Sequence, residues 1–213
     1  MNHTRTTTTP AEAAWIVILC FGWFILASSQ SVAAGFQSGD FSDSAMLPTL
    51  AMEVLCASIA LLVLYRRGYA VASLYPAPTP AGIALGIGLY GVSLYASWLA
   101  VMPFVSGSPQ PIDELMARAS ISLPTIVLFA LINGAYEEIF LLGFLLRGLR
   151  GHGLSMALGI SLLVRVLCHL YQGPLGAVSV LAFGLVLSLY YIRSGALFPA
   201  VFAHVLADIV PFM

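Results

Sequence analysis

Seven long apolar runs, separated by short polar breaks, are the feature of this sequence that most restricts its fold. A run of about 20 apolar residues is long enough to cross the hydrocarbon core of a bilayer as a helix. The runs therefore predict an all-α, polytopic transmembrane helix bundle with about seven spans. The expected spans are residues 13–34, 46–65, 82–104, 123–146, 154–171, 175–192 and 196–212.

The composition favours lipid rather than water around this bundle. Only 8% of the 213 residues are charged, and 60% are hydrophobic. A soluble domain carries about 25% charged residues, so a soluble fold of this size would lack the charges to cover its surface. The net charge of −1 also argues against nucleic acid as a partner.

The arginine residues indicate how the bundle is oriented. All eight basic residues are Arg, which suggests a GC-rich bacterial genome and hence the bacterial cytoplasmic (inner) membrane. Cytoplasmic loops carry an excess of basic residues. With the N-terminus in the cytoplasm, Arg118 alone falls outside and Arg165 lies within a span. The others then fall on the cytoplasmic side: Arg5, Arg66, Arg67, Arg147, Arg150 and Arg193.

The same pattern divides the chain into three parts. Residues 1–12 are expected to form a cytoplasmic tail, residues 13–122 the first three spans with their loops, and residues 123–213 a core of four spans. The first run has a second interpretation, because an apolar run followed by small residues also resembles a cleavable signal peptide. Its length favours a retained helix, and sizing the mature N-terminus would decide between the two.

Ionisable residues lie inside three of the four C-terminal spans. An ionised side chain at mid-bilayer costs about 2.5–3.5 kcal/mol, so such residues usually face the bundle interior and serve a function. The residues are Glu137 and Glu138 in the fourth span, Arg165 and His169 in the fifth, and His204 and Asp208 in the seventh. Glu53, in the second span, is expected near the outer end of its helix in a structural, interfacial role.

Helical geometry sorts these side chains by face. His204 and Asp208 are four residues apart and share a face, as do Arg165 and His169. Glu137 and Glu138 point about 100° apart, so one can face a reacting centre while the other holds a neighbouring helix. Asn133, four residues before Glu137, lies on the Glu137 face. Along the expected spans Glu137 is nearer the cytoplasm than His169, and the two would meet only if the span limits differ by several residues or the helices are staggered or tilted.

This set of side chains suits the activation of water. A carboxylate beside a His can take a proton from water and pass it to a leaving amine. A second His with a carboxylate can stabilise a developing oxyanion. The same groups could instead hold one divalent metal ion such as zinc, with Glu137, His169, His204 and Asp208 as ligands. The sequence leaves both chemistries open, as well as a proton path through a small transporter.

Three short motifs resemble those of the CPBP family, the CAAX-processing and bacteriocin-immunity (Abi) intramembrane proteases. Residues 136–140 (YEEIF) with 143–147 (GFLLR) resemble the first motif, in which two Glu are followed by three other residues and then Arg. Residues 168–173 (CHLYQG) resemble the second, and residues 204–208 (HVLAD) resemble the third. The resemblance extends from about residue 123 to the C-terminus.

The resemblance implies an intramembrane endopeptidase and assigns its residues. Glu137 would be the general base that activates water, assisted by His169, with Glu138 in support. His204 and Asp208 would form the oxyanion-stabilising pair. The substrate would be a membrane-embedded or lipidated peptide. Family members have been described as metalloproteases, and a metal-free glutamate mechanism has also been proposed, so either no cofactor or one divalent metal is implied.

Two positions depart from the family motifs. The chain has Leu142 where the first motif has Arg, and Arg165 where the second motif has Phe four residues before the His. One hypothesis is an exchange, in which the fifth helix supplies the guanidinium and Leu142 fills the apolar space. The alternative is a catalytically degenerate immunity or partner-binding protein. A buried Arg165 needs an anionic partner, and Glu137 or Glu138 is expected to provide it.

Overall fold

The computed structural model describes residues 4–36, 39–105, 107 and 109–213, and every element named within these residues is a helix. The predicted all-α class is confirmed. The helices are α1 (Pro10–Ala33), α2 (Asp43–Arg66), α3 (Pro80–Val101), α4 (Pro111–Ala117), α5 (Leu123–Glu138), α6 (Leu154–Cys168), α7 (Gly173–Ser194) and α8 (Phe198–Ile209). A π-helical segment, η3 (Ile139–Leu146), continues α5, and 3₁₀ turns occupy Val71–Leu74, Met102–Phe104, Arg150–His152, Leu170–Gln172 and Val210–Phe212.

Five helical segments in the described residues are long and apolar enough to cross a membrane. They are Pro10–Ala33, Asp43–Arg66, Pro80–Phe104, Leu123–Leu146 and Leu170–Ser194. The other two apolar helices, α6 and α8, are shorter. The chain is therefore an integral membrane protein in which the seven predicted runs all become helices, two of them short.

The termini of the long helices follow from local sequence. Thr9 and Thr79 precede Pro10 and Pro80, and each Thr side chain accepts a hydrogen bond from a backbone N–H in the first turn. A Thr cap accepts a hydrogen bond from a backbone N–H that would otherwise be unpaired. Pro suits the first helical position because it has no backbone N–H that needs an acceptor. The short helix α4 lies in a stretch predicted only as a polar break. It follows Gln110 and has Pro111 at its first position.

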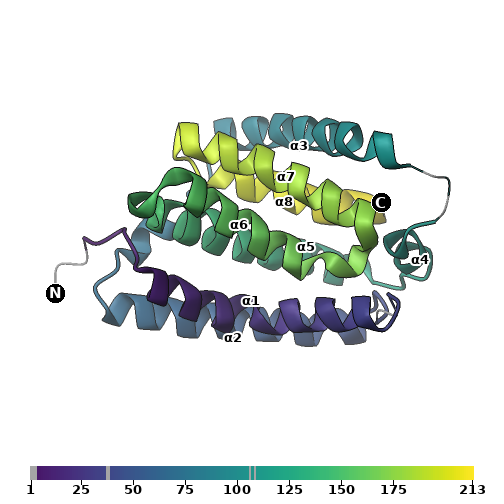
Figure 1. Ribbon diagram of the computed structural model, residues 1–213, viewed down its shortest axis with the longest axis horizontal. Coiled ribbons are helices and arrows are strands. Elements are labelled where there is room, and N and C mark those ends of the chain that lie inside the picture. Colours follow the sequence, from purple (N-terminus) through teal and green to yellow (C-terminus); the bar gives the residue numbers. More distant parts are fainter. Residues whose placement is uncertain (1–3, 37–38, 106, 108) are drawn as a thin grey trace.

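The helices form an antiparallel bundle around α5 (Figure 1). The pair α1 and α2 lies along one side, α3 lies along the opposite side, and α5 and α6 run between them with α7 and α8. The short helix α4 and the C-terminus lie together at one end of the bundle. Every long helix therefore spans from one end to the other, which places the middle of α5 deep in the bundle.

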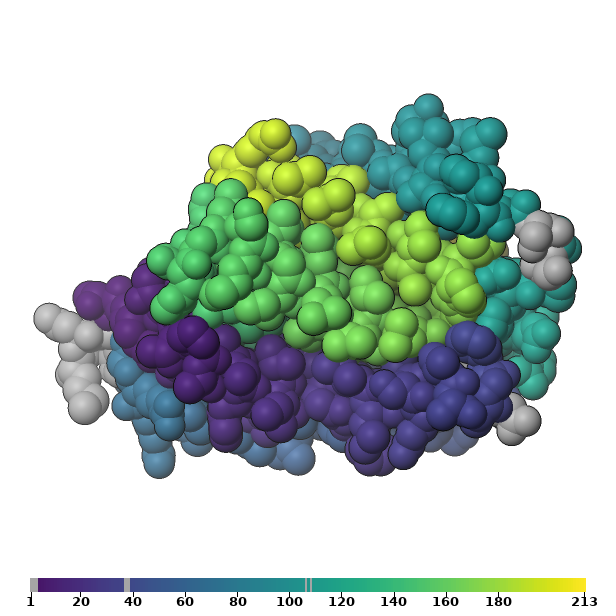
Figure 2. Space-filling view, in the orientation of Figure 1, coloured from purple at the N-terminus to yellow at the C-terminus, as the bar shows by residue number. Residues whose placement is uncertain are grey.

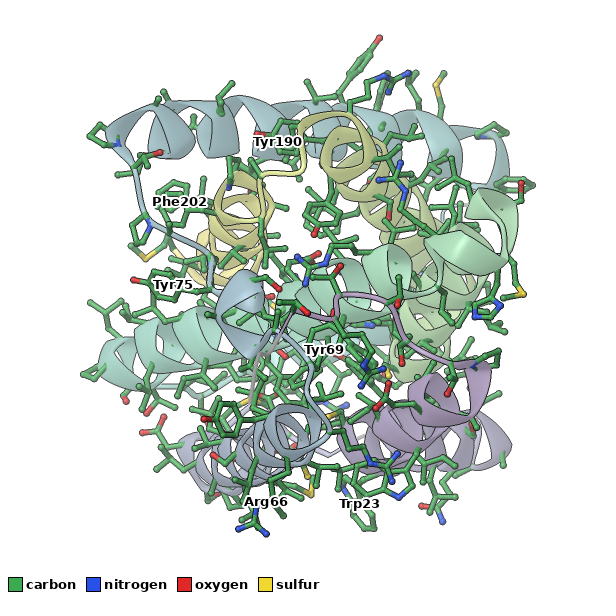
Figure 3. All side chains as sticks on the ribbon, turned by 90° about the vertical axis from the view of Figure 1, so that its left-hand side faces the viewer. Trp23, Arg66, Tyr69, Tyr75, Tyr190 and Phe202 are labelled. Atoms are coloured by element: carbon green, nitrogen blue, oxygen red, sulfur yellow. The ribbon has the colours of Figure 1, made fainter. Side chains whose placement is uncertain are left out.

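Basic residues gather at the opposite end of the bundle, near the N-terminus. Figure 3 views this end, with Arg66 at the periphery and Tyr69 nearer the middle. Arg5 forms an ion pair with Glu12, with 2.7 Å between Nη1 and Oε2, and its guanidinium lies over the ring of Tyr69. Arg147 donates hydrogen bonds to Ser73 and to the Tyr69 hydroxyl, which ties α5 to the start of the α2–α3 connection.

Large apolar side chains cover the outside of the bundle. Figure 2 shows the face formed by α1, α6 and α7, which pack side by side. On α1 alone, Trp15, Ile18 and Trp23 are 45%, 70% and 60% exposed. Soluble monomers rarely expose contiguous apolar patches larger than a few hundred Å². This surface fits contact with lipid tails.

The π-helical segment η3 directly follows the two glutamates. Residues Phe140 to Leu146 are all buried. Ser161 of α6 donates a hydrogen bond of 2.9 Å to the carbonyl of Leu141. This side chain thus provides a hydrogen-bond partner for a backbone carbonyl of the π-helical segment. π-helical turns are rare and occur frequently at functional sites. The apolar run predicted here is present, but its change of helical pitch has no signature in the sequence.

Candidate active site

Three helices bring the predicted ionisable residues into one cluster. Glu137 and Glu138 come from the end of α5, Arg165 from α6, with His169 immediately after it, and His204 and Asp208 from α8. Side-chain contacts join all six. Residues separated by up to 71 positions thus meet near the middle of the bundle, as expected for ionisable residues that face the bundle interior.

The two adjacent glutamates have different surroundings. Glu138 is fully buried, and its carboxylate accepts hydrogen bonds from Arg165 Nη2 at 2.8 Å and from His204 Nδ1 at 2.6 Å. Glu137 lines an internal cavity instead. Its carboxylate keeps one longer contact, 3.3 Å, to Arg165 Nη1. Because consecutive residues point about 100° apart around a helix, Glu138 contacts the neighbouring helices while Glu137 faces the cavity.

Arg165 is the buried cation of the cluster, with 2% of its surface exposed. Its guanidinium contacts both glutamates, as expected from the cost of burying an unpaired charge. It also lies 5.9 Å from the ring centroid of Phe183 on α7. A cation over an aromatic face gains further electrostatic attraction.

Gly184, beside Phe183, leaves the space that Arg165 occupies. A Cβ at this position would lie 2.6 Å from Arg165 Cδ and 2.8 Å from its Nε. We expect Gly184→Ala to displace Arg165 and destabilise the protein by about 1–3 kcal/mol, less the gain of about 1 kcal/mol from helix propensity.

Gly159→Ala is the matched control for this substitution, because Gly159 is also within a helix and a Cβ there would meet nothing within 4 Å. Thermal unfolding in detergent should show a lower midpoint for Gly184→Ala only. Equal midpoints for the two variants would contradict the close packing around Arg165.

His169 lies at the end of α6 with one ring nitrogen committed. Its Nδ1 is 2.8 Å from the Arg165 carbonyl oxygen, which can only accept, so Nδ1 carries the proton. Nε2 lies 3.6 Å from Glu137 Oε1, longer than a hydrogen bond. The expected mismatch in depth is absent because α6 has only 15 residues, about 22 Å, and ends beside Glu137, where α5 passes into η3.

His204 and Asp208 form the third part of the cluster. His204 Nδ1 contacts Glu138, while Nε2 lies 3.7 Å from Asp208 Oδ1. Asn133 donates a hydrogen bond of 2.9 Å to Asp208 Oδ2. Asn133 therefore holds the carboxylate of α8 in place, one turn of α5 away from Glu137.

The cavity beside this cluster has a volume of about 490 Å³. Such a volume is typical of ligand sites. Its walls are mostly apolar and come from every long helix, with aromatic residues such as Phe24, Tyr90 and Phe129. Glu137, His169, His204 and Asp208 supply polar groups along the wall. An apolar peptide segment could lie in this space with its backbone next to the cluster.

Glu53 is the residue that sequence analysis misplaced. It lies in the middle of α2, is 2% exposed and lines the same cavity. The position expected for it, near the outer end of the span, is therefore wrong. One turn earlier, Thr49 lines the cavity too, so this face of α2 looks inward. A single carboxylate in an apolar run forms no repeated spacing of polar residues, so the inward face of α2 could not be predicted from the sequence.

The metal site that the sequence left open does not fit the arrangement of donors. Within the described residues, no group of three or more His, Cys, Asp and Glu side chains is placed to hold a metal ion. A guanidinium already occupies the space between Glu137 and Glu138, and His204 directs Nδ1 at Glu138. Of the four proposed ligands, Glu137 contacts Arg165, and His204 contacts Glu138 and Asp208.

Comparison with known families agrees with the motifs. Residues 119–210 match the family model described as type II CAAX prenyl endopeptidase Rce1-like. This segment is therefore similar to the Rce1-like family. It contains the whole cluster, from Asn133 to Asp208, and its position agrees with the CPBP resemblance of the three motifs. Searches of curated proteins and of solved structures found no match.

Proposed function

We propose that this protein is an intramembrane endopeptidase that hydrolyses peptide bonds of membrane-embedded or lipidated peptides. The observation that carries the proposal is the placement of Glu137. Its carboxylate lines a largely apolar cavity, with His169 at 3.6 Å and the His204–Asp208 pair on the same wall. The Rce1-like family of the surrounding segment supports this chemistry.

In the proposed reaction Glu137 acts as general base. It takes a proton from a water molecule, whose oxygen attacks the scissile carbonyl, and passes the proton to the leaving amine. The unprotonated Nε2 of His169 faces the same space and can accept a hydrogen bond from that water. His204, as an imidazolium, would donate Nδ1–H to Glu138 and Nε2–H to the developing oxyanion.

Arg165 takes the place of the missing motif arginine in this proposal. It contacts Glu137 and Glu138, while Leu142 is fully buried in the apolar segment η3. The guanidinium thus reaches the glutamates from α6 instead of from their own helix. These contacts support the exchange hypothesis over a degenerate site.

The division of the chain follows the same proposal. Residues 123–213 form the catalytic core, and residues 13–122 complete the cavity through α1, α2 and α3. Five of the six arginines assigned to the cytoplasm flank helix ends at the N-terminal end of the bundle, and Arg5 lies in the tail there. We propose that this end faces the cytoplasm of a bacterial inner membrane.

We expect chelators to leave the activity unchanged, because the donor set does not fit a metal. Purified protein treated with 1,10-phenanthroline and then desalted should cleave at the untreated rate. A loss that added zinc restores would contradict the metal-free assignment.

Reconstitution tests the proposed function. The full chain in proteoliposomes is mixed with fluorescence-quenched single-span peptides, with and without a prenylated C-terminal Cys. Specific fragments are expected from the wild type. Absence of fragments from every peptide, together with proton flux across the vesicles, would favour a transporter; absence of both would favour a binding role.

A further inference from the structure

Glu53 is a buried carboxylate that the proposed reaction does not use. It is 2% exposed, and it lines the cavity from α2, which lies outside the segment that matches the family model. Its Oε2 atom has no hydrogen-bond partner among the described residues. An unsatisfied buried polar group costs about 1–3 kcal/mol, and more if it is charged. A group kept at this cost in a ligand-sized cavity points to a ligand.

The charges around the cavity indicate what that ligand carries. Four carboxylates belong to the cluster and its cavity: Glu53, Glu137, Glu138 and Asp208. They face one guanidinium, Arg165, and two imidazoles, so four ionised carboxylates would exceed the positive charges by one even with both imidazoles protonated. Each of the other three carboxylates has a basic partner within 4 Å, and in the described residues Glu53 has none.

We propose that Glu53 is a specificity-determining residue that receives a cationic group of the substrate peptide. The group is a Lys or Arg side chain, or a free α-amine, within the segment that lies in the cavity. A cation there completes the charge balance and provides the partner that Glu53 lacks. Apolar residues around it pack against the aromatic walls. This inference rests on the proposed function and adds its substrate class.

A matched peptide set tests this assignment. Quenched single-span peptides carry Lys, Gln or Glu at one position, scanned along the residues near the cleavage point. At one position or more, the wild type should cleave the Lys peptide at least about tenfold faster in kcat/KM than the Gln peptide. Glu53→Gln should remove this preference, so that the Lys and Gln peptides are cleaved with similar kcat/KM, and Glu53→Asp should keep part of it.

Glu114→Gln is the control, because it makes the same change at an exposed acid on α4. It should leave the Lys preference intact. A Lys preference that survives Glu53→Gln, or no preference for Lys at any position, would overturn the assignment.

A binding measurement separates this inference from the proposed activity. In the Glu137→Gln background, dissociation constants of the Lys and Gln peptides are compared with and without Glu53→Gln. Tighter binding of Lys peptides that depends on Glu53, without any cleavage by the wild type, would support the cation site and contradict the proposed protease activity. Cleavage by the wild type without Glu53-dependent binding would support the protease activity and contradict the cation site.

Discussion

Replacing Glu137 by Gln is expected to lower peptide cleavage at least a hundredfold and to leave the fold intact. General-base catalysis contributes about 10²–10⁴ in rate, and an amide of the same shape cannot take the proton of water. Arg165 keeps its two hydrogen bonds to Glu138 in this variant, so the buried cation stays paired. The measurement is kcat/KM on a quenched peptide, with the unfolding midpoint alongside.

Glu138→Gln is the matched comparison one residue along. Glu138 is fully buried and bonds Arg165 and His204, so its replacement should lower the unfolding midpoint clearly as well as the rate. The geometry predicts that Glu137→Gln lowers the cleavage rate without lowering stability, and that Glu138→Gln lowers both. Normal cleavage by Glu137→Gln would remove Glu137 as the base.

Replacing Arg165 by Met is expected to destabilise the protein by about 3–5 kcal/mol. The variant leaves two adjacent buried carboxylates without their cation, and breaking a buried ion pair from one side has this cost. Little folded protein should survive solubilisation. Arg118→Met provides the control, because Arg118 is exposed beyond α4. An unchanged unfolding midpoint for Arg165→Met would contradict the buried pairing.

The double variant Leu142→Arg, Arg165→Phe tests the exchange of the guanidinium between helices. Arg165→Phe alone should be unstable and inactive, for the reason given above. Adding Leu142→Arg restores the family pattern and should recover both folding and cleavage. An inactive double variant, with both single variants active, would show that the two departures are unrelated.

Much of the fold follows from residue-level physics. The apolar run 123–146 predicts the limits of α5 with η3, because helix length in a bilayer is fixed by thickness and Pro124 marks the first turn. Four-residue spacings place His204 with Asp208, and the cost of a buried charge brings Arg165 to the glutamates. The cluster was therefore predictable because its members are the costly residues of the membrane segments.

Other features depend on packing between helices and were missed. Glu53 faces the cavity because of how α2 sits against α5, which a single charge in an apolar run does not reveal. The π-helical turns at Ile139–Leu146 arise where Ser161 supplies an extra donor from α6. The depth of His169 depended on where α6 ends, which is at Cys168 and not at residue 171 as expected.

Oxygen-18 labelling in a single turnover tests most directly whether Glu137 activates water. Enzyme in excess cleaves a quenched peptide in H₂¹⁸O, and mass spectrometry then follows the product and the enzyme peptide that contains Glu137. General-base catalysis predicts one ¹⁸O atom in the new C-terminal carboxylate of the product and none in Glu137. An unlabelled product with ¹⁸O in Glu137 would mean that the carboxylate itself attacks, and would contradict this account.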